Sequence, residues 1–171
     1  MTNRWCTTLR PYYVDLKILK CPVDSGAKGS TNVPGAGDRV AEVAPRTYLI
    51  NGWNDLYKLR LGKEEWAFFR ILGAGDKTVR ENDVREPSET VLLGEKDQDS
   101  GHFHMDFDQF DDLLQLNQNR HANSAKSGRG GGSDYTMADG SVRFMRFGRS
   151  LAPLNLWAVT DEARRLGLES P

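Results

Sequence analysis

The sequence predicts an α+β fold, in which an antiparallel sheet is accompanied by a helix near each end of the chain. Three observations lead to this prediction. Apolar residues near both ends recur with helical spacing, short apolar runs typical of strands lie between them, and an Asp-Gly pair separates two strand-like segments. We therefore expect one α+β domain that occupies residues 1–171.

Length, composition and charge limit the classes of protein to consider. The chain has 171 residues, of which 38% are hydrophobic and 27% charged, and its net charge is −1. This length suits a single core, and a charge so near zero gives no general attraction to nucleic acid. No stretch approaches the ~20 apolar residues of a membrane helix, and the first residues do not form a signal peptide. These features fit a cytosolic protein and the soluble part of an anchored protein equally well.

The N-terminal region is predicted to contain a helix within residues 3–19. Its apolar residues have helical spacing, and Pro11 is expected to shorten the helix, kink it or begin it. A turn is expected at 21–26, followed by a flexible loop at about 25–38, because that segment is rich in Gly, Ser, Ala and Pro. The apolar residues that define the helix are Trp5, Leu9, Tyr12, Tyr13 and Leu16.

The middle of the chain alternates strand and helix signals. Residues 46–50 and 90–94 are short apolar runs that predict strands, and the first is expected to end in a tight turn at Asn51-Gly52. A short helix is predicted near 63–71, since Gly73 and Gly75 would end it. A helical turn is expected within 109–119.

The clearest local signal is a hairpin near the C-terminal end. Segments 135–138 and 142–147 have strand character and flank Asp139-Gly140-Ser141, which predicts a tight turn between two paired strands. The glycine-rich segment 123–133 before them is expected to be a flexible loop. Residues 156–166 are expected to form a helix or turn, with Thr160 or Asp161 as the N-cap. At least three of the four tryptophans are expected in the core.

An acidic segment supplies candidate metal ligands. Histidines and aspartates alternate with apolar residues over 102–108, so the polar side chains would share one face of a strand. Imidazoles suit a transition metal and carboxylates suit Ca²⁺, although any solvent-facing strand shows the same alternation and that interpretation is favoured. No cofactor is assigned, and Ca²⁺ is the ion kept as a candidate. The candidate ligands are Asp97, Asp99, His102, His104, Asp106 and Asp108.

The remaining reactive residues give no clear site. Cys6 and Cys21 are either two free thiols or one disulfide, which would stabilise the fold by about 3 kcal/mol in an oxidising compartment. Their spacing does not fit a zinc site built from paired ligand clusters. His121 and Asp139 could form a catalytic pair, but no Gly-x-Ser-x-Gly elbow supplies a nucleophile. We therefore expect no enzymatic activity.

Five stretches, in this order along the chain, resemble the pattern of one family. The family is that of prepilin-type proteins with an H-x9-D-G motif, related to type II secretion major pseudopilins and type IV pilins. In this chain 17 residues separate His121 from Asp139, more than in the motif, and the excess lies in the glycine-rich loop. The stretches are Trp5 to Tyr12 with Cys21-Pro22-Val23-Asp24, Thr47-Tyr48 with Asn51-Gly52-Trp53, Pro87 with Thr90 to Glu95, Arg120-His121 with Asp139 to Val142, and Pro153 to Thr160.

The resemblance implies a non-enzymatic subunit domain of a type II secretion pseudopilus or a type IV pilus-like filament. Its partners would be copies of itself, sister pseudopilins and assembly proteins. An N-terminal helix outside this sequence would anchor it in the inner membrane, with the domain in the periplasm. Asp139-Gly140 would form the hairpin turn, His121 would hydrogen-bond near it, and Trp157 would belong to the same structural motif. Major pseudopilins bind calcium in a C-terminal loop, but no matching loop motif occurs here.

Two functions of other classes remain open from the sequence. One is an extracytoplasmic ligand-binding or adhesive module that uses segment 97–112 and exposed aromatic residues. The other is a metal-dependent hydrolase, which would use His121 and Asp139. Ion binding by the acidic segment and loss of turnover after substitution at His121 or Asp139 would distinguish them from a filament subunit.

Overall fold

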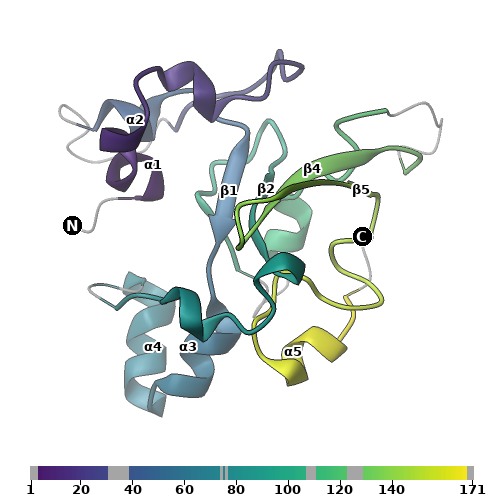
Figure 1. Ribbon diagram of the computed structural model, residues 1–171. Coiled ribbons are helices and arrows are strands. Elements are labelled where there is room, and N and C mark those ends of the chain that lie inside the picture. Colours follow the sequence, from purple (N-terminus) through teal and green to yellow (C-terminus); the bar gives the residue numbers. More distant parts are fainter. Residues whose placement is uncertain are drawn as a thin grey trace.

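A five-stranded sheet organises the molecule. The computed structural model describes residues 4–30, 39–73, 75, 77–106, 111–122 and 129–168. The strand order is β3-β1-β2-β4-β5, and every neighbouring pair is antiparallel except β1 and β3 (Figure 1). The antiparallel sheet expected from the sequence is therefore confirmed for three of the four strand pairs, and the β1–β3 pair is parallel. The strands are β1 (Tyr48–Asn51), β2 (Val91–Glu95), β3 (His104–Met105), β4 (Gly132–Met137) and β5 (Val142–Arg146).

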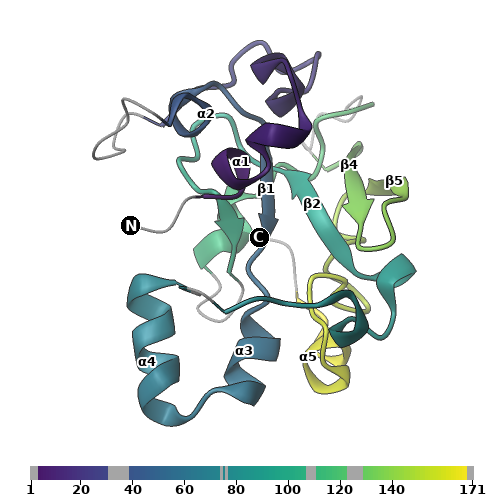
Figure 2. The same ribbon diagram turned by 60° about the vertical axis from the view of Figure 1, so that its left-hand side comes forward.

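The helices are short and lie around the sheet. Helices α1 and α2 lie beyond one end of β1, whereas α3 and α4 lie beyond its other end, next to α5 (Figures 1 and 2). Within the described residues, no helix is long and apolar enough to cross a membrane. The α-helices are α1 (Trp5–Thr8), α2 (Val40–Val43), α3 (Asn54–Arg60), α4 (Lys63–Leu72) and α5 (Asp161–Arg165). Short 3-10 helices occur at Arg10–Tyr12, Leu16–Leu19, Glu81–Asp83, Pro87–Glu89 and Asp111–Gln115.

The predicted N-terminal helix is not found as one element. Helix α1 is a single turn, and two separate 3-10 turns follow it. Pro11 cannot donate a backbone hydrogen bond, and Tyr13 is extended, with φ −139° and ψ 142°. Asp15 then caps the second 3-10 turn by accepting from the Lys17 amide at 2.9 Å. The apolar residues do have helical spacing, but the helical backbone is interrupted twice, once between α1 and the first 3-10 turn and once before the second.

Other local predictions are confirmed. Helix α4 ends at Gly73, which has φ 79°, and the strand predicted at 90–94 is β2. The hairpin joins β4 to β5, and the Thr160 hydroxyl caps α5 by accepting from the Ala163 amide. The predicted loop at 123–133 is too long, because Gly132 and Ser133 already belong to β4; residues 123–128 and 31–38 lie outside the described part of the chain.

The Asn51-Gly52 pair has a role that differs from the prediction. The left-handed residue after β1 is Trp53, with φ 56°, and not Gly52. The Asn51 side chain is buried and donates to the carbonyls of Val91 and Trp157 at 2.8 and 2.7 Å. Asn51 therefore ties β1 to β2 and to the C-terminal region.

The main core lies on the sheet, with a smaller core under α1 and α2. Trp157 is fully buried and meets Tyr135 edge-on, with ring centroids 6.2 Å apart. The other tryptophans are only partly buried, so the prediction of at least three core tryptophans is wrong. Trp5, for example, lies where its indole can donate to the Phe103 carbonyl. The small core contains Cys6, Leu19, Ala41, Ala44 and Phe103.

Candidate functional site

The predicted hairpin turn is present and is exposed. Gly140 has φ 85°, a backbone conformation that glycine adopts without steric cost. The Asp139 carboxylate accepts from the Ser141 amide at 2.9 Å and from its hydroxyl at 2.7 Å. These hydrogen bonds lower the pKa of Asp139 below its ordinary value. Asp139 and Gly140 thus shape the bend between β4 and β5.

His121 lies at the opposite end of β4 from this turn. Its backbone exchanges two hydrogen bonds with Gly132, the first residue of β4, at 2.8 and 3.0 Å. Asp139, in contrast, lies two residues beyond Met137, the last residue of the strand. The prediction that His121 forms a hydrogen bond near the turn is therefore wrong. His121 and Asp139 also cannot act as a catalytic pair, because the whole length of β4 separates them.

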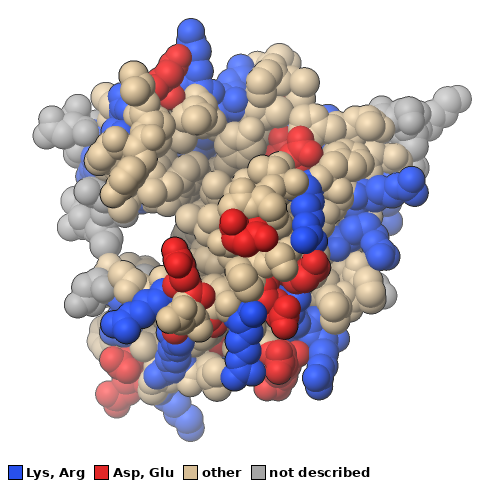
Figure 3. Space-filling model, viewed as in Figure 1, with Lys and Arg blue, Asp and Glu red and all other residues tan. Residues whose placement is uncertain are grey.

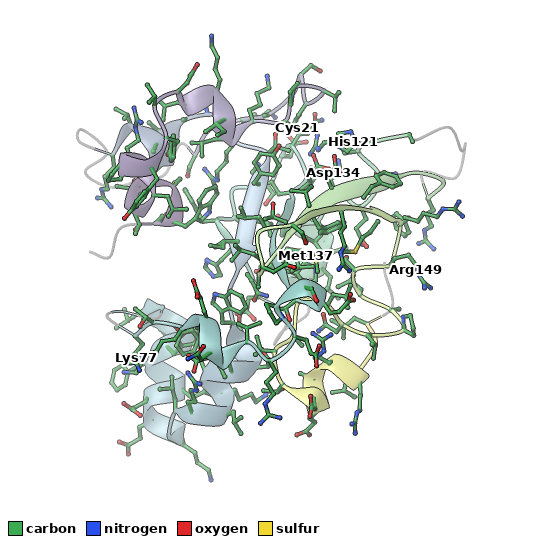
Figure 4. The ribbon with its side chains drawn as sticks, in the orientation of Figure 1. Cys21, Lys77, His121, Asp134, Met137 and Arg149 are labelled. Atoms are coloured by element: carbon green, nitrogen blue, oxygen red, sulfur yellow. The ribbon has the colours of Figure 1, made fainter. Side chains whose placement is uncertain are left out.

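His121 instead meets a cysteine and a glutamate. Ligand atoms of Cys21, Glu95 and His121 all lie within 4.8 Å of one another. The His121 Nε2 atom is 3.7 Å from Cys21 Sγ, 3.1 Å from Glu95 Oε2 and 3.5 Å from Asp134 Oδ2. Figure 4 shows Cys21, His121 and Asp134 together at one end of the sheet, with Met137 farther along β4. We call Cys21, Glu95, His121 and Asp134 the polar cluster.

Local structure explains how each side chain reaches the polar cluster. Cys21 follows the second N-terminal 3-10 turn, and its amide donates to the Thr47 hydroxyl at 3.1 Å. Glu95 is the last residue of β2 and pairs with Tyr48 of β1. The Asp134 amide on β4 donates to Glu95 Oε2 at 3.2 Å. Three distant parts of the sequence therefore meet only because β2 lies between β1 and β4.

A buried arginine borders the cluster. The Arg120 guanidinium lies 3.0 Å from Asp24 Oδ2 and 3.3 Å from Glu95 Oε1. The side chains of Asp24, Glu95 and Arg120 are nearly inaccessible to solvent. Asp24 also accepts from the Thr47 hydroxyl at 2.8 Å. The arginine thus compensates two carboxylates that would otherwise be costly to bury.

Burial sets the electrostatics of the thiol and of a neighbouring tyrosine. Burial raises the pKa of Cys21; a backbone hydrogen bond from Val23 opposes this rise, and the nearby Glu95 adds to it. Burial likewise raises the pKa of Tyr48 to about 12, and the nearby Cys21 and Glu95 contribute. A reactive cysteine requires a lowered pKa, so this environment is unlike that of a nucleophile.

The contacts also differ from those of a catalytic triad. In a triad, the nucleophile and the acid contact different ring nitrogens of the histidine. Here Cys21 Sγ and the Glu95 carboxylate both approach the same nitrogen, Nε2 of His121. The donor atoms of Cys21, Glu95 and His121 thus lie within 4.8 Å of one another, close enough to hold one metal ion.

Among the residues that the structure describes, the metal ligands predicted from the acidic segment do not come together in this way. His102 Nδ1 lies 2.6 Å from Asp112 Oδ1, and Asp112 also accepts from the Asp106 amide. Asp99 pairs with Lys28. The remaining candidates are Asp97, which accepts from the Asp99 amide, His104, which is exposed, and Asp108, which lies outside the described residues.

The two cysteines are both free thiols, not the disulfide considered above. Cys6 packs in the small core, whereas Cys21 belongs to the polar cluster. Cys21, Glu95 and His121 lie in separate motif stretches of the sequence, and none of them was predicted to be a metal ligand. No short spacing links them, so only their shared presence in those stretches could have drawn attention to all three.

Comparison of the chain with protein-family models, with curated proteins and with solved structures found no match.

Proposed function

We propose that this chain is a non-enzymatic subunit domain of a pilin-like or pseudopilin-like filament, as the resemblance of its motif stretches implies. One structural observation supports the proposal more than any other. Residues from four of the five stretches join in one buried polar network. Its members are Cys21 and Asp24, Thr47, Glu95, and Arg120 and His121. The motif residues thus hold distant segments together, as expected of a subunit that acts through its shape.

The fifth stretch is joined to the sheet in the same manner. The side-chain amide of Asn51 donates to the Trp157 carbonyl, and the Trp157 side chain packs in the main core. Gly94, from the third stretch, lies directly under the Trp157 ring, since a Cβ there would come within 2.7 Å of Trp157 Cζ2. The motif residues in this part of the molecule therefore serve packing, which fits an architectural role.

Exposed apolar side chains supply candidate contact surfaces for assembly. Helix α4 has no buried residue, and Phe68, Ile71 and Leu72 are 65%, 80% and 70% exposed along one side of it. Tyr12 and Val14 near the N-terminal end are 85% and 93% exposed. Large exposed apolar patches mark interaction sites. In the view of Figure 3, Lys, Arg, Asp and Glu gather over the lower part of the molecule, whereas the upper part around α1 carries few.

The decisive test is the reading frame upstream of Met1. The proposal expects a basic leader ending in Gly, followed by about 20 apolar residues that can span the inner membrane. Fractionation of the producing cells should then place the full-length protein in the inner membrane, with this domain in the periplasm. A reading frame that starts at Met1, with the protein in the cytosol, would contradict the proposal.

A second test addresses assembly itself. In the full-length protein, Phe68→Ser combined with Ile71→Ser should reduce incorporation into sheared filaments without changing the unfolding midpoint. Leu166→Ser is the matched control, because Leu166 is also exposed, at 63%, but lies next to α5. Equal incorporation by both variants would show that α4 is not part of the assembly surface.

A further inference from the structure

The distances from His121 Nε2 to its three neighbouring donor atoms are close to those between ligands of a tetrahedral zinc ion. Zinc bonds of 2.0–2.3 Å at tetrahedral angles place neighbouring donor atoms about 3.3–3.7 Å apart. The His121 Nε2 atom lies 3.7 Å from Cys21 Sγ and 3.1 Å from Glu95 Oε2. Asp134 Oδ2 lies 3.5 Å from the same nitrogen. The ligand atoms of Cys21, Glu95 and His121 lie within 4.8 Å of one another, and the partly exposed Asp134 side chain would have to turn toward them to join as a fourth donor.

We propose that Cys21, Glu95 and His121 bind one zinc ion and that Asp134 completes a tetrahedral site. A thiolate and an imidazole are ligands that zinc prefers, whereas calcium takes oxygen ligands. Cys21 and Glu95 are 5% and 1% exposed, so two donors are already held out of water. The Asp134 side chain is 47% exposed, which gives an ion access from solvent.

Arg120 fits this site as a support for its ligands. It contacts Glu95 through Oε1, and both Glu95 oxygens lie close to His121 Nε2, Oε1 at 3.2 Å and Oε2 at 3.1 Å. Such outer contacts orient the carboxylates that bind a metal.

The ion would have a structural role. Its ligands come from the N-terminal segment, the end of β2, the segment before β4, and β4 itself. Binding would therefore fasten the N-terminal part of the chain to the sheet and favour the folded state. This inference does not depend on the proposed filament role, because a zinc ion could stabilise this domain in any protein.

Metal titration of the purified chain, kept reduced, tests the inference directly. Zinc chloride should compete with a chromophoric chelator at one ion per chain and raise the midpoint of unfolding. Cobalt chloride should give a thiolate-to-cobalt charge-transfer absorption, which zinc then removes. If the cluster is only a hydrogen-bonded network, neither signal appears in the wild-type chain and the proposal is overturned.

Matched variants identify the ligands. Cys21→Ser should abolish the cobalt–thiolate absorption, whereas Cys6→Ser, which removes the other buried cysteine, should retain it. His121→Asn provides a second variant should Cys21→Ser fail to fold, and it should weaken zinc binding at least tenfold. Asp134→Asn should weaken binding about 10- to 100-fold, and Asp139→Asn should leave it unchanged. Absorption that survives Cys21→Ser, or that is lost in folded Cys6→Ser, would overturn the proposal.

Discussion

The two ends of β4 show how differently one strand can be anchored. At its beginning, Gly132 and Asp134 lie beside the polar cluster, where side chains from four segments of the chain meet. At its end, Asp139 and Gly140 form an exposed turn stabilised by neighbours in sequence. The first end depends on long-range contacts between charges, and the second on the conformation of the local backbone. Substitutions at the two ends should therefore differ in size and in kind.

The largest difference is expected between two arginines. Arg120→Met leaves the buried carboxylates of Asp24 and Glu95 without their cation, which should cost about 3–5 kcal/mol of unfolding free energy. Arg143→Met, near the turn, removes only a partly exposed pair with Glu89 and should cost about 0–1 kcal/mol. Urea denaturation of both variants measures the difference. Equal losses would show that the two ends are not distinct.

Alanine substitutions at two glycines, Gly132 and Gly140, compare the two ends of β4 a second time. A Cβ on Gly132 would lie 2.2 Å from the Met145 carbonyl oxygen and 2.5 Å from the Phe144 ring. Because the backbone of β5 would have to move, Gly132→Ala should cost about 1–3 kcal/mol or more. Thermal unfolding should show a lower midpoint, and a shift smaller than that of Gly140→Ala would contradict this account of close packing.

The second glycine is required for another reason. A Cβ on Gly140 would meet no atom within 4 Å, but its φ of 85° is unfavourable for alanine. Gly140→Ala should therefore cost about 1 kcal/mol, without altering the metal response of the polar cluster. Denaturation and zinc titration of the same sample measure both effects. A loss of zinc binding in this variant would mean that the two ends of β4 are coupled.

The smallest expected effect belongs to Asp139→Asn. The folded pKa of Asp139 is depressed by its hydrogen bonds to Ser141, so its charge stabilises the fold above the unfolded pKa. That contribution is lost as the pH falls through the folded pKa. The wild type should be slightly more stable than Asp139→Asn at about pH 6, and the advantage should shrink as the pH is lowered through the folded pKa of Asp139. An advantage that grows on acidification would contradict the assigned role of the carboxylate.

Local chemistry in the sequence was sufficient to predict several elements. The Asp139-Gly140 turn, the strand at 90–94, the end of α4 at Gly73 and the Thr160 cap depend on neighbours within a few residues. Such contacts form wherever the chain folds locally. The prediction of one N-terminal helix was wrong, because the helical spacing of apolar residues continues past Pro11 although the helical backbone does not.

The polar cluster was decided by tertiary structure. Cys21, Glu95 and His121 are separated by tens of residues, and they meet because β2 lies between β1 and β4 with Glu95 at its end. Nothing local fixes that strand order. It follows from the burial of apolar side chains that come from distant parts of the chain. The sequence determined which residues could bind a metal, and only the sheet topology determined which of them lie together.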